Sequence, residues 1–147
     1  MVRFLPKKGK RLGAYWLLSI LCSNLFLVAK KILIIDDDLG FSAISKAALE
    51  QAKYQVFLAE TGIKGLEAAK KELPDLILLD FMLSDMNGND VLKRLKNDQS
   101  TAHIPVAMLT NFGQEPIVKE SLNVGALDFL LKYQVGTEDL VSKVDSL

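Results

Sequence analysis

The chain has 147 residues, of which 50% are hydrophobic and 24% are charged, and its formal net charge is zero. This length suits one domain with a substantial core rather than two. A single cysteine, Cys22, and a single histidine, His103, exclude an internal disulfide, a cysteine-based zinc cluster and a multi-histidine metal site.

Residues 1–29 form a basic and then apolar N-terminal extension. They carry five basic residues and no acidic one, and residues 12–29 are uncharged. Three interpretations remain open: a membrane anchor, a cleaved signal peptide, or an upstream extension of the reading frame with translation starting at Val28. We favour the last, because a strand pattern begins at Lys31 without a linker and because the charge asymmetry would place an anchored body outside the cell. We therefore expect a cytoplasmic protein, with membrane contact only if residues 12–29 are a real anchor.

The body of the chain, residues 30–147, is acidic. It holds 13 basic residues and all 18 acidic residues, a net charge of −5. Proteins that bind nucleic acid directly present a basic face to the phosphates. Nucleic acid is therefore not an expected direct partner.

From Lys31 onward, short apolar runs alternate with segments of helical period. The runs predict strands at residues 32–35, 54–59, 76–79, 105–109 and 127–131. Apolar residues at helical spacing predict a helix after each strand; the second is expected to end at Pro74 and the fourth near Gly125. Five such units predict an α/β domain over residues 30–147, with a parallel sheet covered by helices on both faces.

Polar residues follow four of the five predicted strands. They are Asp36, Asp37 and Asp38 after the first strand, Asp80 after the third, Thr110 after the fourth and Lys132 after the fifth. Any one of them has an ordinary explanation, such as an aspartate that caps the next helix. Because the carboxyl ends of parallel strands meet at one edge of the sheet, where ligands bind, their joint appearance predicts a functional site there.

The residue types indicate phosphoryl chemistry. Clustered carboxylates repel one another unless a cation is present, and an oxygen-only site suits Mg²⁺. A carboxylate can also act as a nucleophile and form an aspartyl phosphate. A lysine and a hydroxyl would then stabilise the transferring group. No glycine-rich phosphate loop is present, so nucleotide binding is not indicated.

Four segments together resemble the receiver domain of two-component response regulators. They are Ile-Leu-Ile-Ile-Asp-Asp-Asp at 32–38, Pro-Asp-Leu-Ile-Leu-Leu-Asp at 74–80, Met-Leu-Thr at 108–110 and Gly-Ala-Leu-Asp-Phe-Leu-Leu-Lys at 125–132. The resemblance covers residues 30–147. It implies a flavodoxin-like, doubly wound sheet of five parallel strands in the order 2-1-3-4-5, with five helices.

The resemblance also implies a role for individual residues. Asp80 matches the phosphoacceptor, with Thr110 and Lys132 beside it as the groups that stabilise the phosphoryl oxygens. Asp36 and Asp37 match the acidic pair that holds Mg²⁺ together with Asp80, and Met82 matches the position that gives a backbone carbonyl to the metal. Thr110 and Phe129 match the hydroxyl and the aromatic residue that move together in the switch.

The sequence departs from the family pattern at four positions. Ser84 stands where proline is usual, which predicts a looser loop after Asp80. Tyr133 replaces the proline that usually follows the lysine, and Asn111 is larger than the usual residue, which predicts slower phosphoryl exchange at Asp80. Phe129, in place of the more usual tyrosine, lacks a hydroxyl, and this is expected to change partner contacts more than switching.

We therefore expect a stand-alone receiver that is a phosphoacceptor switch rather than an enzyme. Its partners would be a histidine kinase or phosphotransfer protein and a downstream protein target, with a phosphorylation-linked homodimer as a further state. Two alternatives are a receiver-like binding module that is not phosphorylated and a haloacid-dehalogenase-like phosphatase. The phosphatase would use Asp36-x-Asp38, but Gly40 replaces its usual threonine.

Overall fold

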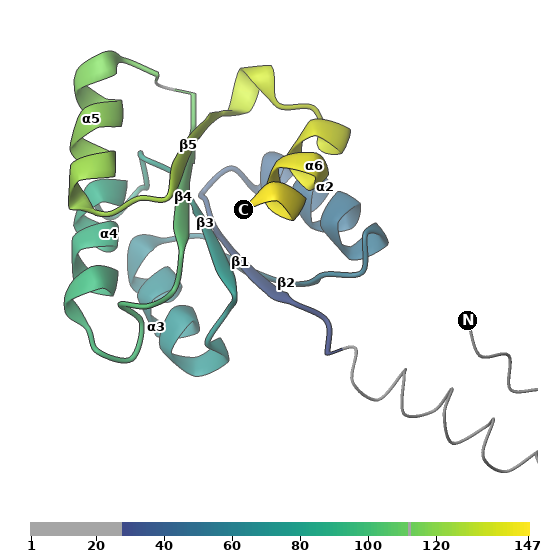
Figure 1. The fold of residues 1–147 in the computed structure, drawn as a ribbon, viewed down its shortest axis with the longest axis horizontal. Coiled ribbons are helices and arrows are strands. Elements are labelled where there is room, and N and C mark those ends of the chain that lie inside the picture. Colours follow the sequence, from purple (N-terminus) through teal and green to yellow (C-terminus); the bar gives the residue numbers. More distant parts are fainter. Residues whose placement is uncertain (1–27, 112) are drawn as a thin grey trace, which may run out of the picture.

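The computed structural model describes residues 28–111 and 113–147 (Figure 1). The anchor, signal-peptide and start-site interpretations concern a segment that lies, up to residue 27, outside the described residues. Within the described part of the chain, no helix has the length and apolar character needed to cross a membrane.

A five-stranded parallel sheet forms the centre of the described domain, in the order β2-β1-β3-β4-β5. This confirms the predicted order. The bounds are β1 Lys31–Ile35, β2 Gln55–Ala59, β3 Leu76–Leu79, β4 Val106–Thr110 and β5 Asp128–Leu131. The strand order reverses at β1, which lies between β2 and β3. In open parallel sheets, ligands bind outside the carboxyl ends of the strands that flank such a reversal, here β1 and β3.

Five α-helices cover the two faces of the sheet in the described residues, as predicted. They are α2 Leu39–Gln51, α3 Gly62–Glu72, α4 Gly88–Asn97, α5 Glu115–Val124 and α6 Thr137–Ser146, and a short 3₁₀ helix, η1 Lys132–Gln134, follows β5. Helices α3, α4 and α5 lie on one side of the sheet, and α2 and α6 lie on the other (Figure 1). Such three-layer packing follows from right-handed crossovers between parallel strands.

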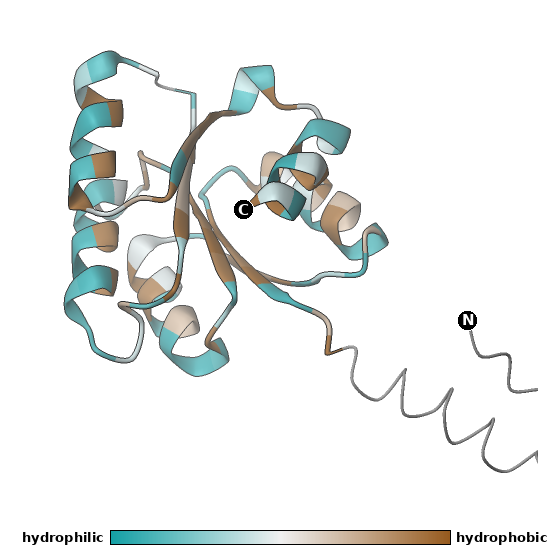
Figure 2. Cartoon of the chain, viewed as in Figure 1, coloured by the Kyte–Doolittle hydropathy of each residue, from teal (hydrophilic) through white to brown (hydrophobic). Residues whose placement is uncertain are grey.

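Alternate residues of each strand face opposite sides of the sheet, which gives the domain two cores. Leu33 and Ile35 of β1 join the cluster under α3 and α4, whereas Ile32 and Ile34 join the cluster under α2 and α6. All four are at most 1% exposed. The strands are mostly apolar (Figure 2), and β3 and β4 are buried at every residue, as expected for central strands covered on both faces.

One local detail differs from the sequence prediction, and another agrees with it. Ile44 is one of the apolar residues whose helical spacing predicts this helix, yet it is 60% exposed, and α2 buries Ser42, Ser45 and Leu49. Helix α3 ends at Glu72, and Leu73 adopts a left-handed conformation with φ 46° before Pro74. The residue before a proline avoids the helical region, so the helix stops ahead of the proline.

Candidate functional site

Two carboxylates lie on either side of the point where the strand order reverses. Asp36 directly follows β1 and Asp80 directly follows β3, and these strands are hydrogen-bonded neighbours. The backbone N–H of Asp80 donates to the carbonyl of Ile35 at 2.9 Å, which extends the ladder to the site. Both aspartates are buried, at 2% and 7% exposure. Charged side chains are rarely buried to this extent unless they are paired.

The three consecutive aspartates after β1 have different roles in the structure. Asp38 caps α2, since its Oδ1 accepts the N–H of Phe41 at 3.0 Å. Asp36 and Asp37 instead join Asp80 in a cluster in which one carboxylate oxygen of each residue lies within 4.8 Å of the other two. The cap explains Asp38 as a structural residue, so the Asp36-x-Asp38 pair needed by the phosphatase alternative is not available as a unit.

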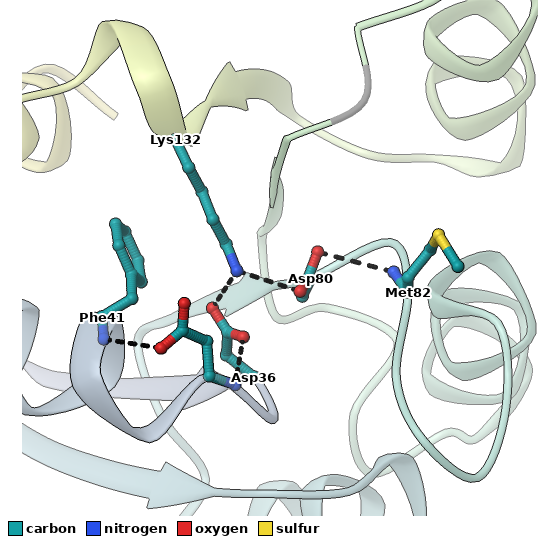
Figure 3. Close-up of polar contacts among 6 residues, drawn as sticks. Asp36, Phe41, Asp80, Met82 and Lys132 are labelled. Carbon is teal, nitrogen blue, oxygen red and sulfur yellow. Dashed lines mark hydrogen bonds and ion pairs between the residues drawn. The ribbon is translucent and has the colours of Figure 1, made fainter.

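Lys132 directly follows the edge strand β5, and its side chain reaches this cluster at the carboxyl edge of the sheet. It is the first residue of η1, and its Nζ lies 2.5 Å from Asp36 Oδ2 and 2.9 Å from Asp80 Oδ2 (Figure 3). The same ammonium group lies 4.9 Å from the centre of the Phe41 ring. The lysine is itself buried, so its charge acts in a poorly screened environment. One ammonium group therefore forms ion pairs with two buried carboxylates.

The charges at this site do not balance. Burial raises the pKa of Asp36 to about 6, although the hydrogen bond and charge of Lys132 act to lower it. Burial acts to lower the pKa of Lys132, but its bonds to Asp36 and Asp80 outweigh burial and raise that pKa above the ordinary value. The lysine thus stays protonated, while three carboxylates share its single charge. The cluster favours an additional cation.

The loop after Asp80 holds the Asp80 carboxylate in place. The N–H of Met82 donates to Asp80 Oδ1 at 3.4 Å (Figure 3). At the other end of the loop, the N–H of Gly88 donates to the carbonyl of Phe81 at 2.6 Å. A Cβ at position 88 would lie 2.2 Å from the carbonyl oxygen of Asp80, so only glycine permits this approach.

Thr110 and Phe129 lie on neighbouring strands. Thr110 is the fully buried last residue of β4, and its partner in β5 is Leu131, the residue before Lys132. Phe129 pairs with Met108 and packs, half-buried, against the core under α3 and α4. The structure thus brings Asp36, Asp37, Asp80 and Lys132 together, and it places Thr110 at the same edge of the sheet.

Sequence analysis did not identify two contacts of this region. Phe41 is one of the apolar residues whose helical spacing predicts α2, yet its ring lies under the ammonium group of Lys132. Asp85, in the loop after Asp80, accepts hydrogen bonds from the first two N–H groups of α3. Neither contact has a local sequence signal, because each joins residues more than twenty positions apart.

Three departures from the family pattern, Ser84, Asn111 and Tyr133, are exposed.

Comparison with known proteins agrees with this geometry. The family model described as response regulator receiver domain matches residues 32–145. The chain is 43% identical over 117 residues to the DNA-binding dual master transcriptional regulator RpaA of Synechocystis, an alignment that covers 80% of this chain and 48% of RpaA. It is 36% identical over 103 residues to sporulation initiation phosphotransferase F of Bacillus subtilis, covering 70% of this chain and 82% of that protein.

A solved structure shows the same fold. The CheY-like receiver domain protein of Methanospirillum hungatei superposes with a TM-score of 0.75 at 31% identity, over 80% of this chain and 92% of that one. The chain spans about half the length of RpaA and most of the length of the phosphotransferase. The match to the family model covers most of the chain. The chain therefore belongs to the response regulator receiver domain family of two-component signalling.

Proposed function

We propose that this protein is a phosphorylation-dependent switch that accepts a phosphoryl group on Asp80 from a histidine kinase or a phosphotransfer protein. The observation that carries the proposal is the buried arrangement of Asp80 with Asp36, Asp37 and Lys132. A structural ion pair would need one carboxylate for each ammonium group. The surplus of carboxylates at the reversal point of the sheet is instead suited to phosphoryl transfer.

In the proposed reaction, a carboxylate oxygen of Asp80 attacks the phosphorus of a phosphohistidine. The new O–P bond forms as the P–N bond breaks, and the imidazole of the donor leaves with the electron pair. Lys132, now paired with Asp80 Oδ2, would neutralise a phosphoryl oxygen, and Thr110 would donate a hydrogen bond to another. Water then hydrolyses the acyl phosphate, which releases inorganic phosphate and regenerates the Asp80 carboxylate, so the chemistry resets a switch.

The residues of the cluster fit a Mg²⁺ ion. Its preferred ligands are one or two carboxylates, water and phosphate oxygens. Asp36, Asp37 and Asp80 would supply the carboxylates and Met82 a backbone carbonyl. Burial raises the pKa of Asp36, and a bound cation would favour its ionised form. When bound, the ion would neutralise charge that develops on the phosphoryl oxygens.

The output of the switch would be a change in the surface formed by α5, β5 and α6. Thr110 at the end of β4 and Phe129 in β5 are the two residues through which the phosphoryl group would act on this surface. The recipients would be a downstream protein or a second copy of the receiver. Such switches shift a population between two packings of the same elements.

The test is phosphorylation of the full chain with acetyl phosphate and Mg²⁺, followed by intact mass. Wild type and Asp90→Asn, which changes an exposed residue of α4, should each gain one phosphoryl group, and Asp80→Asn should gain none. A wild-type protein that gains no phosphoryl group and does not bind beryllofluoride would contradict the proposal and favour the unphosphorylated binding module. Turnover of a chromogenic phosphate ester would instead favour the phosphatase.

A further inference from the structure

The loop between Asp80 and α4, residues 81–87, is folded back on itself, and we call it the acceptor loop. Met82 and Asn87 form an isolated antiparallel bridge. The N–H of Leu83 donates to the carbonyl of Met86 at 3.3 Å. Ser84 and Asp85 therefore occupy the turn at the tip of the loop. Met82, the proposed source of a metal-binding carbonyl, lies on one strand of this narrow hairpin.

Asp85 fastens the tip of the acceptor loop to α3. Its Oδ1 accepts the N–H of Gly62 at 2.8 Å, and its Oδ2 accepts the N–H of Ile63 at 2.9 Å. The first N–H groups of a helix have no partner within the helix, and this end of a helix favours negative charge. These hydrogen bonds, that of Ile63 foremost, lower the pKa of Asp85, so the exposed carboxylate remains ionised and bound.

This contact is more than a helix cap, because α3 already has its own. Thr61 is the N-cap residue, and its hydroxyl accepts the N–H of Lys64 at 3.2 Å. Asp85 comes from a segment more than twenty residues away in sequence. Next to it, the side chain of Met86 packs so closely on α3 that a Cβ at Gly62 would lie 2.6 Å from it.

Helix α3 is in turn packed directly on the strand that ends at the acidic pair. A Cβ at Gly65 would lie 2.5 Å from the side chain of Ile35, so the helix touches the residue immediately before Asp36. Asp85 thus links the loop that carries Met82, through the first turns of α3, to the end of β1. The two segments that would hold the metal are fixed relative to each other by this path.

We propose that Asp85 is a positioning residue that holds the Met82 backbone against the carboxylate cluster and thereby strengthens binding of a divalent cation. The inference rests on the function proposed above. Ser84 stands beside it where the family usually has proline, a residue that would stiffen the turn by fixing its backbone. The two hydrogen bonds that Asp85 accepts from α3 restrain the same turn in place of a proline.

The experiment measures Mn²⁺ binding to the full chain from the loss of the free-ion electron paramagnetic resonance signal. Asp85→Ala should weaken Mn²⁺ binding about tenfold, the lower end of the effect of residues that act through a ligand. Asp85→Asn keeps one acceptor and should weaken binding less. With acetyl phosphate, Asp85→Ala should need about ten times more Mg²⁺ for half-maximal phosphorylation and reach the wild-type rate at saturation.

Thr61→Ala is the matched control, since it removes the cap of the same helix without touching the acceptor loop. It should bind Mn²⁺ as wild type does. Ser84→Pro in the Asp85→Ala background should restore most of the lost affinity, which a purely structural role of Asp85 would not predict. The inference is overturned if Asp85→Ala binds Mn²⁺ like wild type, if Thr61→Ala weakens binding equally, or if Ser84→Pro restores nothing.

The wild-type protein separates failure of this inference from failure of the proposed function. Wild type that binds Mn²⁺ and is phosphorylated, beside an Asp85→Ala variant with unchanged affinity, removes only the role of Asp85. Wild type that neither binds Mn²⁺ nor gains a phosphoryl group removes the proposed function, and the role of Asp85 with it.

Discussion

The buried charges near Asp80 depend on one residue, Lys132. Its ammonium group contacts both Asp36 and Asp80, and it is the only basic side chain with a described ion pair to either. A buried ion pair adds little to stability compared with an apolar replacement of both partners. Removal of one partner is costly, however, because the other charge is left buried and unpaired. The lysine thus supports the fold as well as the proposed chemistry.

Lys132→Met should lower the free energy of unfolding at neutral pH by about 3 kcal/mol in the absence of divalent cations. The loss should shrink when Mg²⁺ is added, since a bound cation replaces part of the missing charge. Urea unfolding with and without Mg²⁺ measures both effects. Lys143→Met is the control: Lys143 is exposed and lies 3.8 Å from Asp128, so its loss should cost less than about 1 kcal/mol. Equal stability of Lys132→Met and wild type would contradict the expectation.

At the scale of elements, one buried polar contact joins α4 to α5. The hydroxyl of Ser121 lies 2.7 Å from Asn89 Oδ1, and the two residues are 0% and 3% exposed. Asn89 Nδ2 has no hydrogen-bond partner among the described residues. Helix α4 follows the acceptor loop directly, and α5 precedes the strand of Phe129. The contact therefore connects the two sides of the proposed switch.

Ser121→Ala should reduce stability by about 1–3 kcal/mol, because the amide of Asn89 then stays buried without its partner. Asn89→Leu added to Ser121→Ala should recover most of that loss, since neither helix then buries an unpaired polar group. Thermal unfolding of the two single variants and the double variant tests the coupling. Additive effects of the two changes would show that the contact does not join the helices energetically.

A second inter-element contact joins the last helix to the residue before β2. The hydroxyl of Tyr54, just before β2, donates to Asp145 of α6. This hydrogen bond, with burial and the charge of Asp145, raises the pKa of Tyr54 to about 12. The neutral phenol is thus favoured in the folded state over the unfolded state. The resulting stabilisation is complete below the unfolded pKa of about 10 and is lost as pH rises towards 12.

The pH dependence can be measured from phenolate absorbance. The difference in phenolate absorbance between wild type and Tyr54→Phe should titrate near pH 12. The free energy of unfolding of wild type should exceed that of Tyr54→Phe by a constant amount below about pH 10 and by less above it. Asp145→Ala should return the titration of Tyr54 towards its ordinary value. A titration of Tyr54 near pH 10 in wild type would show that the contact with Asp145 is absent in solution.

The elements were predictable from sequence to the extent that their apolar patterns are strong. The run 76–79 is apolar without interruption and forms β3, and Val91, Leu92 and Leu95 are buried on α4 as their spacing predicts. The apolar spacing does not identify the buried face of α2 and α5, because Ser42, Ser45 and Ser121 occupy it. Small hydroxyl side chains allow close packing of a helix but carry no hydrophobic signal.

The site was predictable for a different reason. Parallel strands all end at one edge, so the position of Asp36, Asp80, Thr110 and Lys132 in the sequence determines where they meet. The contacts of Asp85 and Phe41 depend on how a loop and a helix are oriented in three dimensions. No spacing rule relates such residues, and the pairing emerges only when the domain is assembled.

For the molecule as a whole, the surplus negative charge at the site should make stability depend on divalent cations. A ligand that binds only the folded state stabilises it by mass action, by about 2.7 kcal/mol at one hundred times its dissociation constant. Small domains unfold cooperatively, so a local charge effect changes the stability of the entire domain. For a domain of this size the midpoint of thermal unfolding should rise by roughly 10 °C with Mg²⁺.

Calorimetry across a Mg²⁺ titration measures this shift, and Asp37→Asn, which removes an exposed member of the cluster, should reduce it. Sodium chloride at matched ionic strength is the control, because it screens charge without occupying the cluster. An equal rise with sodium chloride would mean that screening, and not a bound ion, relieves the repulsion. A rise specific to Mg²⁺ and reduced in Asp37→Asn would locate the cation at the acidic cluster, where the proposed phosphoryl transfer requires it.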